Sequence, residues 1–490
     1  MYSKNGEYCL HRSVCFRFLR QENSYPLFSI NQFPVRNKKF HADETKSFKR
    51  WDFFETLLLY PNNSNSFFFV LIIFVLLYNL NENRMKPICY FFLCFLFCIS
   101  AGAKNRKAVY IIIDGVPADQ IERLHTPAVF DIASKGAYAR AYTGGEIGSY
   151  SQTPTISAVG YTNLLTSTWV NKHNVPGNSD LKPNYNYWTL FRIAKEQPKD
   201  YKTAIYSSWT DNRTVLLGEG KPETNYLKID YVRDGYELDT VNFPNKEKDL
   251  RIFDIDEVVS KEAAKGIRID APDLSWVYLW YTDDAGHIEG NGAFFDDYVQ
   301  KADAQVQRIW DAVKYREANF DEEWMVVVTT DHGREESGHG HGGQSYRERT
   351  TWISTNVPVN THFKSNLLSI TDIAPSISRF LGFEIPQPVL WEQDGMSFVG
   401  QCDICNLKTL PYDNEVWLTW DSYSKDVPVA IYAACSNNYK EGKKDEWIRL
   451  ATVSSGEGKY QVDLSSLPVS KFYKFVAAAP GNHLNRWLVK

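Results

Sequence analysis

Runs of apolar residues alternate with stretches of helical periodicity along the middle of the chain. Apolar residues recur at helical spacing over 296–318, and 126–136 and 371–382 carry the start and stop signals of capped helices. Strands that alternate with helices predict an α/β fold with a mainly parallel sheet and helices on both faces. The runs whose unbroken apolar sequence is typical of buried strands are 108–114, 201–208, 275–281 and 323–330.

The hydrophobic pattern changes after Gly400. Short runs rich in β-branched and aromatic residues follow one another, separated by turn residues, as in EVWLTWDSY (415–423). This pattern is typical of a small β-sandwich. We therefore expect an α/β domain over 104–400 and a β-sandwich module over 411–490.

The first hundred residues have a different pattern. Met85 is followed by a lysine, an apolar run and the small residues Ala-Gly-Ala, which is the layout of a secretory signal peptide. We expect 85–103 to be that signal peptide and 1–84 to be an upstream extension outside the fold. The alternative is a genuine N-terminal extension with one or two membrane spans, although the apolar run 66–80 is short for a span.

These expectations place the protein in the periplasm or outside the cell, with no stable membrane span in the mature chain. The net charge of −5 provides no basic surface for a nucleic-acid duplex. After the expected signal peptide the chain has three cysteines, Cys402, Cys405 and Cys435, which allow at most one disulfide. No feature of the sequence indicates an oligomeric state.

Three of the predicted strands end at or just before an aspartate. Asp114 follows the first strand, Asp283 follows the strand at 275–281, and Asp331 follows the last one. In an open α/β sheet, active sites form outside the carboxyl ends of the strands. A single aspartate in such a place is usually a turn or cap residue, but we expect these three carboxylates to converge.

Histidines accompany these aspartates. His287 lies four residues after Asp283, His332 follows Asp331, and the glycine-rich segment GHGHGG adds His339 and His341. Any one of them is more often an ordinary surface or core residue than a ligand. Clustered carboxylates and imidazoles, however, suit zinc or a similar divalent ion. Three aspartates and three histidines, with one histidine taken from the glycine-rich segment, are too many ligands for one tetrahedral zinc. They fit two ions that keep room for substrate or water.

A hydroxyl-rich stretch precedes another predicted helix, SAVGYTNLLTS. Its first residue, Ser157, could be an ordinary N-cap. Beside a metal site it could instead be a nucleophile, because the helix N-terminus and the ion both favour the alkoxide, and the same backbone N–H groups can hold a phosphate. The expected metal site favours the nucleophile.

Five segments, in this order, resemble the alkaline phosphatase superfamily, and most closely its type I phosphodiesterase/nucleotide pyrophosphatase branch. The similarity spans about residues 106–400. It implies an alkaline-phosphatase-like sheet, a serine or threonine nucleophile at a helix N-terminus, and two zinc ions. The segments are IIIDG, TPTISAVGYTNLLTSTWVNKHNVPGN, YTDDAGH, TTDHG and GHGG.

The resemblance assigns roles to individual residues. Asn178 matches the asparagine that hydrogen-bonds a phosphoryl oxygen, and His173 matches a structural histidine. Thr166 matches the threonine of a Thr-Gly pair whose glycine is Ser167 here. The implied ligands of one ion are Asp114, Ser157, Asp331 and His332, and those of the other are Asp283, His287 and His341.

Three positions have a neighbouring alternative of the same type. Asp284 could replace Asp283, His339 could replace His341, and Thr155 could replace Ser157. The spacing of the family's motifs selects Asp283, His341 and Ser157.

The resemblance implies a hydrolase of phosphate esters that works through a phosphoseryl intermediate and acts on a small phosphate ester or a nucleotide. Arg213 is a candidate phosphate-binding residue, although it could simply pair with Asp211 on the surface. Because one monoesterase branch has a lysine where Asp211 stands, we expect diester or pyrophosphate substrates. The alternatives are a phosphomonoesterase and an inactive secreted binding protein. The Cys/Ser-x-Pro-x-Arg motif of sulfatases is missing at 157–161.

Overall fold

The computed structural model describes residues 104–490. The expected upstream extension (1–84) and signal peptide (85–103) lie outside the described residues. Within 104–490, no helix is both long enough and apolar enough to cross a membrane.

A seven-stranded sheet forms the centre of the α/β domain, in the order β2-β7-β6-β1-β5-β3-β4. Neighbouring strands from β6 to β4 pair in parallel, whereas β7 is antiparallel to both of its neighbours. The mainly parallel sheet predicted from the sequence is therefore confirmed. The strands are β1 (Asn105–Ile113), β2 (Ala137–Tyr142), β3 (Thr203–Ser207), β4 (Tyr231–Arg233), β5 (Leu274–Leu279), β6 (Glu322–Thr329) and β7 (Thr350–Thr355).

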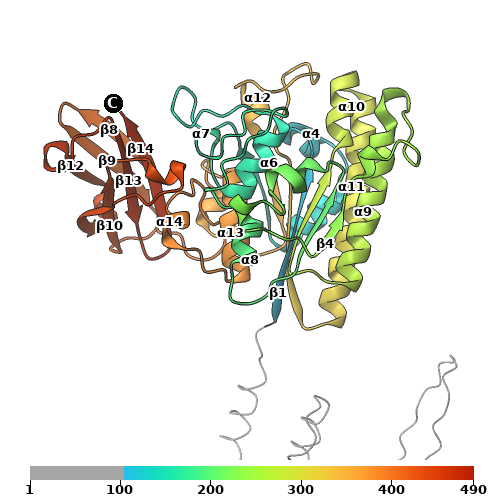
Figure 1. Cartoon of the computed structure of the whole chain (residues 1–490). Coiled ribbons are helices and arrows are strands. Elements are labelled where there is room, and N and C mark those ends of the chain that lie inside the picture. Colours follow the sequence, from blue (N-terminus) through green and yellow to red (C-terminus); the bar gives the residue numbers. More distant parts are fainter. Residues whose placement is uncertain (1–103) are drawn as a thin grey trace, which may run out of the picture. The chain divides into compact units, whose positions relative to one another are not determined.

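Helices cover both faces of this sheet (Figure 1). Alternate residues of β1 serve the two faces: Val109 and Ile111 pack with α5, α9 and α11, and Tyr110 and Ile112 pack with α6, α8 and α13. The helices are α4 (Ala118–Arg123), α5 (Pro127–Lys135), α6 (Ser157–Thr166), α7 (Val170–His173), α8 (Leu190–Lys195), α9 (Leu250–Ile269), α10 (Tyr281–Glu289), α11 (Ala293–Asn319), α12 (Tyr346–Arg349), α13 (Ile373–Leu381) and α14 (Gln387–Leu390).

Some elements have weak sequence signals and were not predicted. In β2, most positions are half-buried or exposed at the edge of the sheet, so its hydrophobic alternation is poor. The strand β7, TTWIST, is fully buried despite its hydroxyl residues, because hydroxyls such as that of Ser354 donate to the backbone, here to Val129 O at 2.7 Å.

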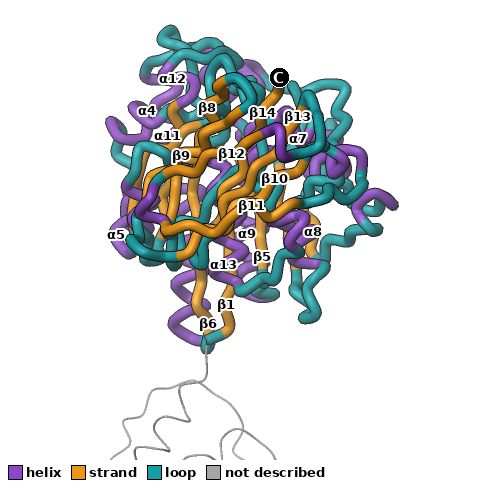
Figure 2. The backbone as a smooth tube through the Cα atoms, turned by 90° about the vertical axis from the view of Figure 1, so that its left-hand side faces the viewer, coloured by secondary structure: helices purple, strands orange, loops and turns teal. Residues whose placement is uncertain are grey.

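The C-terminal module consists of two antiparallel sheets, β11-β10-β13-β14 and β12-β9-β8, around a core of its own (Figure 2). Its first strand begins at Ile404, before the predicted boundary at residue 411. A register irregularity between Cys405 and Lys408 breaks the alternation of the strand there, so the sequence pattern did not reveal this part. Within 104–490, Cys402, Cys405 and Cys435 are free thiols. The strands are β8 (Ile404–Tyr412), β9 (Glu415–Ser422), β10 (Pro428–Ala434), β11 (Ile448–Ser454), β12 (Lys459–Asp463), β13 (Phe472–Ala478) and β14 (His483–Val489).

Candidate active site

The sheet brings the three predicted aspartates to one edge. The strands β6, β1 and β5 are neighbours, and their carboxyl ends lead to Asp331, Asp114 and Asp283. Asp114 directly follows β1 and Asp331 follows β6 after one intervening residue, whereas Asp283 stands in the first turn of α10. All three carboxylates are buried. Chain order and parallel pairing are therefore enough to gather them.

The helix α6 brings Ser157 to the same place. Ser157 is the first residue of the helix, and Ile156 occupies the N-cap position without any side-chain cap. Asn178 takes over the capping role, because its Oδ1 accepts a hydrogen bond from the N–H of Ala158 at 2.9 Å. The hydroxyl of Ser157 is thus not used as a cap and points to His332, whose Nε2 is 3.3 Å from its Oγ.

The ring of His332 is oriented by its own backbone. Its Nδ1–H donates to Gly333 O at 2.9 Å, so that Nε2 presents a lone pair to the site. This Nε2 lies 3.2 Å from Asp331 Oδ2 and 3.4 Å from Asp114 Oδ1. Among the described residues, neither of these carboxylate oxygens has a hydrogen-bond donor.

A cluster of buried acceptors without donors is unfavourable unless a cation lies among them. Burial, reinforced by the charges of Asp331 and Asp283, raises the pKa of Asp114 well above its usual range. Burial also raises the pKa of Asp331 to about 7 and lowers that of His332. Two carboxylates, an imidazole and a hydroxyl are a donor set that suits a divalent ion.

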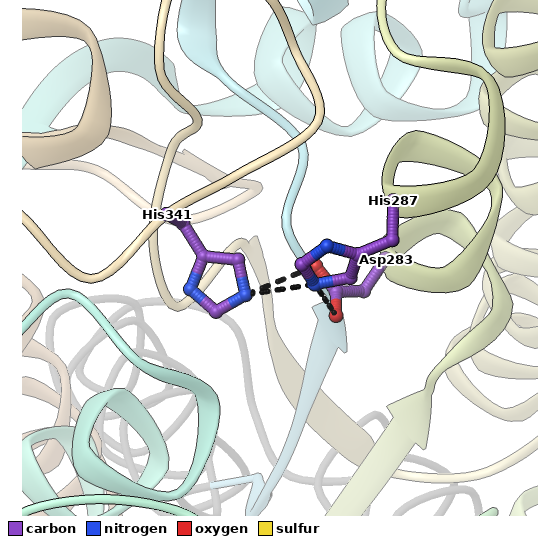
Figure 3. Close-up of side chains that lie close together, drawn as sticks. All are labelled: Asp283, His287 and His341. Carbon is purple, nitrogen blue, oxygen red and sulfur yellow. Dashed lines mark hydrogen bonds and ion pairs between the residues drawn. The ribbon is translucent and has the colours of Figure 1, made fainter.

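A second cluster lies beside the first and contains Asp283, His287 and His341 (Figure 3). The Nε2 atoms of His287 and His341 are 3.0 Å apart. Asp283 Oδ2 lies 3.2 Å from His287 Nε2, and Asp283 Oδ1 lies 3.7 Å from His341 Nε2. His341 Nδ1 donates to Thr155 O at 2.9 Å, which turns its Nε2 toward the cluster. These ligand atoms are close enough together to hold one metal ion.

The geometry also separates the alternatives left by the sequence. Asp284 lies outside both clusters, where burial raises its pKa to about 7. His339 Nδ1 donates to the backbone oxygen of His287 at 3.1 Å and therefore helps to hold His287 in place. Thr155 uses its hydroxyl to hold the loop of His341, donating to Gly343 O and accepting from Gly342 N. Only the residues selected by motif spacing converge.

The sequence did not point to three residues that bind the aspartates. Arg334 is fully buried and donates to Asp283 Oδ1 at 2.5 Å, and its Nε holds Gly338 O. The hydroxyls of Tyr161 and Tyr278 both donate to Asp114 Oδ2. The position of Tyr161, one helical turn after Ser157, was a signal available in the sequence.

Two glycines allow the elements of the site to approach closely. A Cβ atom at Gly160 would lie 2.8 Å from the backbone oxygen of Asp331. Gly115 has φ +64°, and a Cβ there would meet Asp283 Oδ1 at 2.5 Å. The helix α6 and the strand-end aspartates can therefore lie side by side only without these side chains.

Arg213 does not have the phosphate-binding role expected for it. It belongs to the π-helical turn Asn212–Leu216, where its guanidinium pairs with Asp234 at 2.6 Å and Glu219 at 2.5 Å. The expected alternative partner, Asp211, instead accepts from Thr214. Because two carboxylates occupy the guanidinium, Arg213 has a structural role.

His173 is a structural residue, as expected. Its Nε2–H donates to Asn163 Oδ1 at 2.8 Å, and its Nδ1 accepts from Val175 N at 3.1 Å. Burial lowers its pKa to about 3, so the ring is neutral. It fixes the segment that leads from α6 to Asn178.

Solved structures with a similar fold are only distantly related in sequence. A putative sulfatase from Bacteroides thetaiotaomicron is 13% identical, with 74% of this chain and 86% of that chain covered and a TM-score of 0.43. Murine ectonucleotide pyrophosphatase/phosphodiesterase 5 is 12% identical, with 57% and 96% covered and a TM-score of 0.38. No curated protein matches the sequence.

The family comparison is more direct. The family model described as type I phosphodiesterase/nucleotide pyrophosphatase matches residues 108–365, which is more than half of the chain. The match contains both clusters and Ser157. The chain therefore belongs to the type I phosphodiesterase/nucleotide pyrophosphatase family, within the alkaline phosphatase superfamily.

Proposed function

We propose that the protein is a secreted hydrolase of phosphodiester or nucleotide pyrophosphate bonds that holds two divalent metal ions and works through a phosphoseryl intermediate. Family membership supports phosphoester hydrolysis. The observation that carries the finer proposal is the position of Ser157. Its hydroxyl does not cap α6 and lies beside His332, next to carboxylate oxygens of Asp114 and Asp331 that have no donor among the described residues. The signal-peptide pattern at 85–103 supports secretion.

The proposed metal ligands follow the two clusters. Bound there, zinc or a similar ion would supply positive charge that stabilises oxygen atoms as negative charge develops on them. The ligands of one ion would be Asp114, Ser157, Asp331 and His332, and those of the other Asp283, His287 and His341.

The chain's own groups then account for the reaction. Ser157 Oγ, after losing its proton to solvent, attacks phosphorus as the bond to the leaving oxygen breaks. This forms a phosphoseryl group, and the leaving oxygen takes up a proton from solvent. Water then attacks phosphorus and loses a proton to solvent as the bond to Ser157 Oγ breaks and this oxygen is protonated again, so that two displacements retain the configuration. The free N–H groups at the start of α6 would bind a non-bridging oxygen. Asn178 accepts from Ala158 through Oδ1, which leaves its NH2 group able to donate to the same oxygen.

Substitution of the nucleophile tests this proposal. We expect Ser157→Ala to lower hydrolysis of bis(p-nitrophenyl) phosphate by at least about 1000-fold, because no other hydroxyl replaces its Oγ. The zinc content should stay near that of the wild type, because the carboxylates and histidines remain. Ser149→Ala, at a half-buried serine whose hydroxyl bonds only within the preceding loop, is the matched control and should retain activity. Turnover by Ser157→Ala close to wild type would refute the proposed nucleophile.

Metal analysis and chelation test the proposed ions. We expect about two zinc or similar ions per chain, as in other two-metal sites. Chelation should lower activity by about 1000-fold or more, which corresponds to about 4 kcal/mol of lost transition-state stabilisation. Activity that survives complete removal of the metal would contradict the proposal. A comparison of p-nitrophenyl phosphate with its diester in the same preparation would decide between monoester and diester preference.

A further inference from the structure

A groove with mixed polar and apolar walls lies between the α/β domain and the C-terminal module. Two adjoining cavities of about 400 and 140 Å3 share Tyr142, Asn406 and Arg486 in their walls. The larger one is within the size range of small-molecule sites. None of the proposed metal ligands lines either cavity, so the groove is separate from the candidate active site.

Arg349, at the end of α12, is the central cation of this groove. It is half-buried, and within 104–490 no carboxylate forms an ion pair with it. Its Nη2 donates to Gly145 O, whereas its Nε is buried without a partner. A half-buried guanidinium without a carboxylate partner can bind an anion through its remaining N–H groups.

Two further cations lie in the walls. Arg486 on β14 pairs with Glu146 through Nη2, but its Nε is also buried without a partner in the described part of the chain. Lys408 on β8 is exposed and lines the larger cavity. Since Glu146 is the only carboxylate in the larger cavity's wall, the net charge there is positive.

The smaller cavity also contains two carboxylates, Asp394 and Asp372. Asp394 pairs with the buried Lys172 at 2.6 Å. Asp372 accepts from His362 at 2.8 Å and from the N–H groups of Ser369 and Met396. Both carboxylates are therefore already bonded within the fold.

The remaining lining contains aromatic rings and amide groups. Tyr346 is 75% exposed at the rim, and the Tyr142 ring lies under Arg349 with its centroid 6.0 Å from the guanidinium carbon. Asn366 and Asn406 add amide groups. An exposed tyrosine, two amides and a cation together fit a hydroxyl-rich body that carries one anionic group.

We propose that this groove is a second binding site, which takes a sugar bearing a carboxylate or phosphate group, with Arg349 as the partner of that group. Arg486 and Lys408 complete the positive wall. The site does not depend on the proposed phosphodiesterase activity, because none of its lining residues is a proposed metal ligand or the proposed nucleophile. It also gives the junction with the C-terminal module a binding role.

Calorimetric titration of the metal-loaded full chain tests this site. Glucuronate and glucose 6-phosphate are the two probes, and glucose is the neutral control. We expect at least one anionic probe to bind with a dissociation constant of about 1 mM or lower and glucose to bind more weakly. The probe that binds identifies the anionic group, and absence of binding by both probes would overturn the proposal.

Variants locate the binding. Arg349→Gln should weaken binding of the anionic probe by about tenfold or more, and hydrolysis of bis(p-nitrophenyl) phosphate should be unchanged. Arg449→Gln removes a charge from β11 outside the groove and should leave binding unchanged. Lys408→Glu, on an exposed side chain, provides a second test that does not threaten folding and should also weaken binding. Equal binding by wild type, Arg349→Gln and Lys408→Glu would show that the probe binds elsewhere.

Discussion

Buried charges meet at the domain–module junction and at the candidate active site, but their partners differ. At the junction, Lys172 Nζ lies 2.6 Å from Asp394, and Lys474 Nζ lies 2.5 Å from Glu392 and 2.7 Å from Asp445. At the candidate active site, Arg334 binds Asp283, but Asp114 and Asp331 have no cationic side chain beside them apart from histidine.

The comparison separates two uses of buried charge. A cluster that contains its own ammonium groups is complete as folded and holds parts of the fold together. The junction holds the segment after α6 to the C-terminal module. Lys172 belongs to α7 of that segment, and its Nζ also donates to Asn485 Oδ1 of β14 at 2.9 Å. Around His332, in contrast, two buried carboxylate oxygens have no donor among residues 104–490.

The largest expected effect comes from breaking the complete cluster. Lys474→Met should lower the free energy of unfolding by about 3–5 kcal/mol, because it leaves Glu392 and Asp445 buried without their cation. Denaturant unfolding followed by tryptophan fluorescence would measure the loss. Lys459→Met, at an exposed lysine of β12, is the control and should change stability by less than about 0.5 kcal/mol. Equal losses in the two variants would contradict the structural role of the junction.

His173 tests a charge avoided by burial. Because its folded pKa is lowered to about 3, the unfolded chain binds a proton below pH 6.5 that the folded chain does not bind. The free energy of unfolding is therefore unaffected by this titration above pH 6.5 and decreases as pH falls from 6.5 toward 3. Between pH 7.5 and 4.5, wild type should lose about 2.6 kcal/mol relative to His173→Gln. A constant difference between the two proteins across this range would contradict the explanation.

The smallest expected effect has the opposite sign. In metal-free protein, Asp331→Asn should raise the free energy of unfolding by about 1 kcal/mol. The substitution removes a buried charge near Asp114 and offers an N–H to His332 Nε2, which lies 3.2 Å from Asp331 Oδ2. The same variant should lose metal at this position. Destabilisation of the metal-free variant would show that Asp331 is stabilising without an ion.

The sequence predicted the parts of the site that follow from chain order. Asp114 and Asp331 stand at the carboxyl ends of long apolar strands, so parallel pairing alone brings them together. Arg334 and Tyr278 could not be predicted in this way, because their roles depend on contacts with residues 51 and 164 positions away. The role expected for Arg213 was wrong for the same reason, because its partner Asp234 is 21 positions away. The edge strand β2 was missed because its burial pattern is weak.

Gly160 has a consequence for redesign of this protein. The position carries no reactive group, yet the helix can keep its distance from Asp331 only because a hydrogen atom stands where a methyl group would be. An alanine there would act as a spacer and move the whole helix outward. Mutant libraries that aim at new substrates should therefore leave this position constant and vary the loops around it.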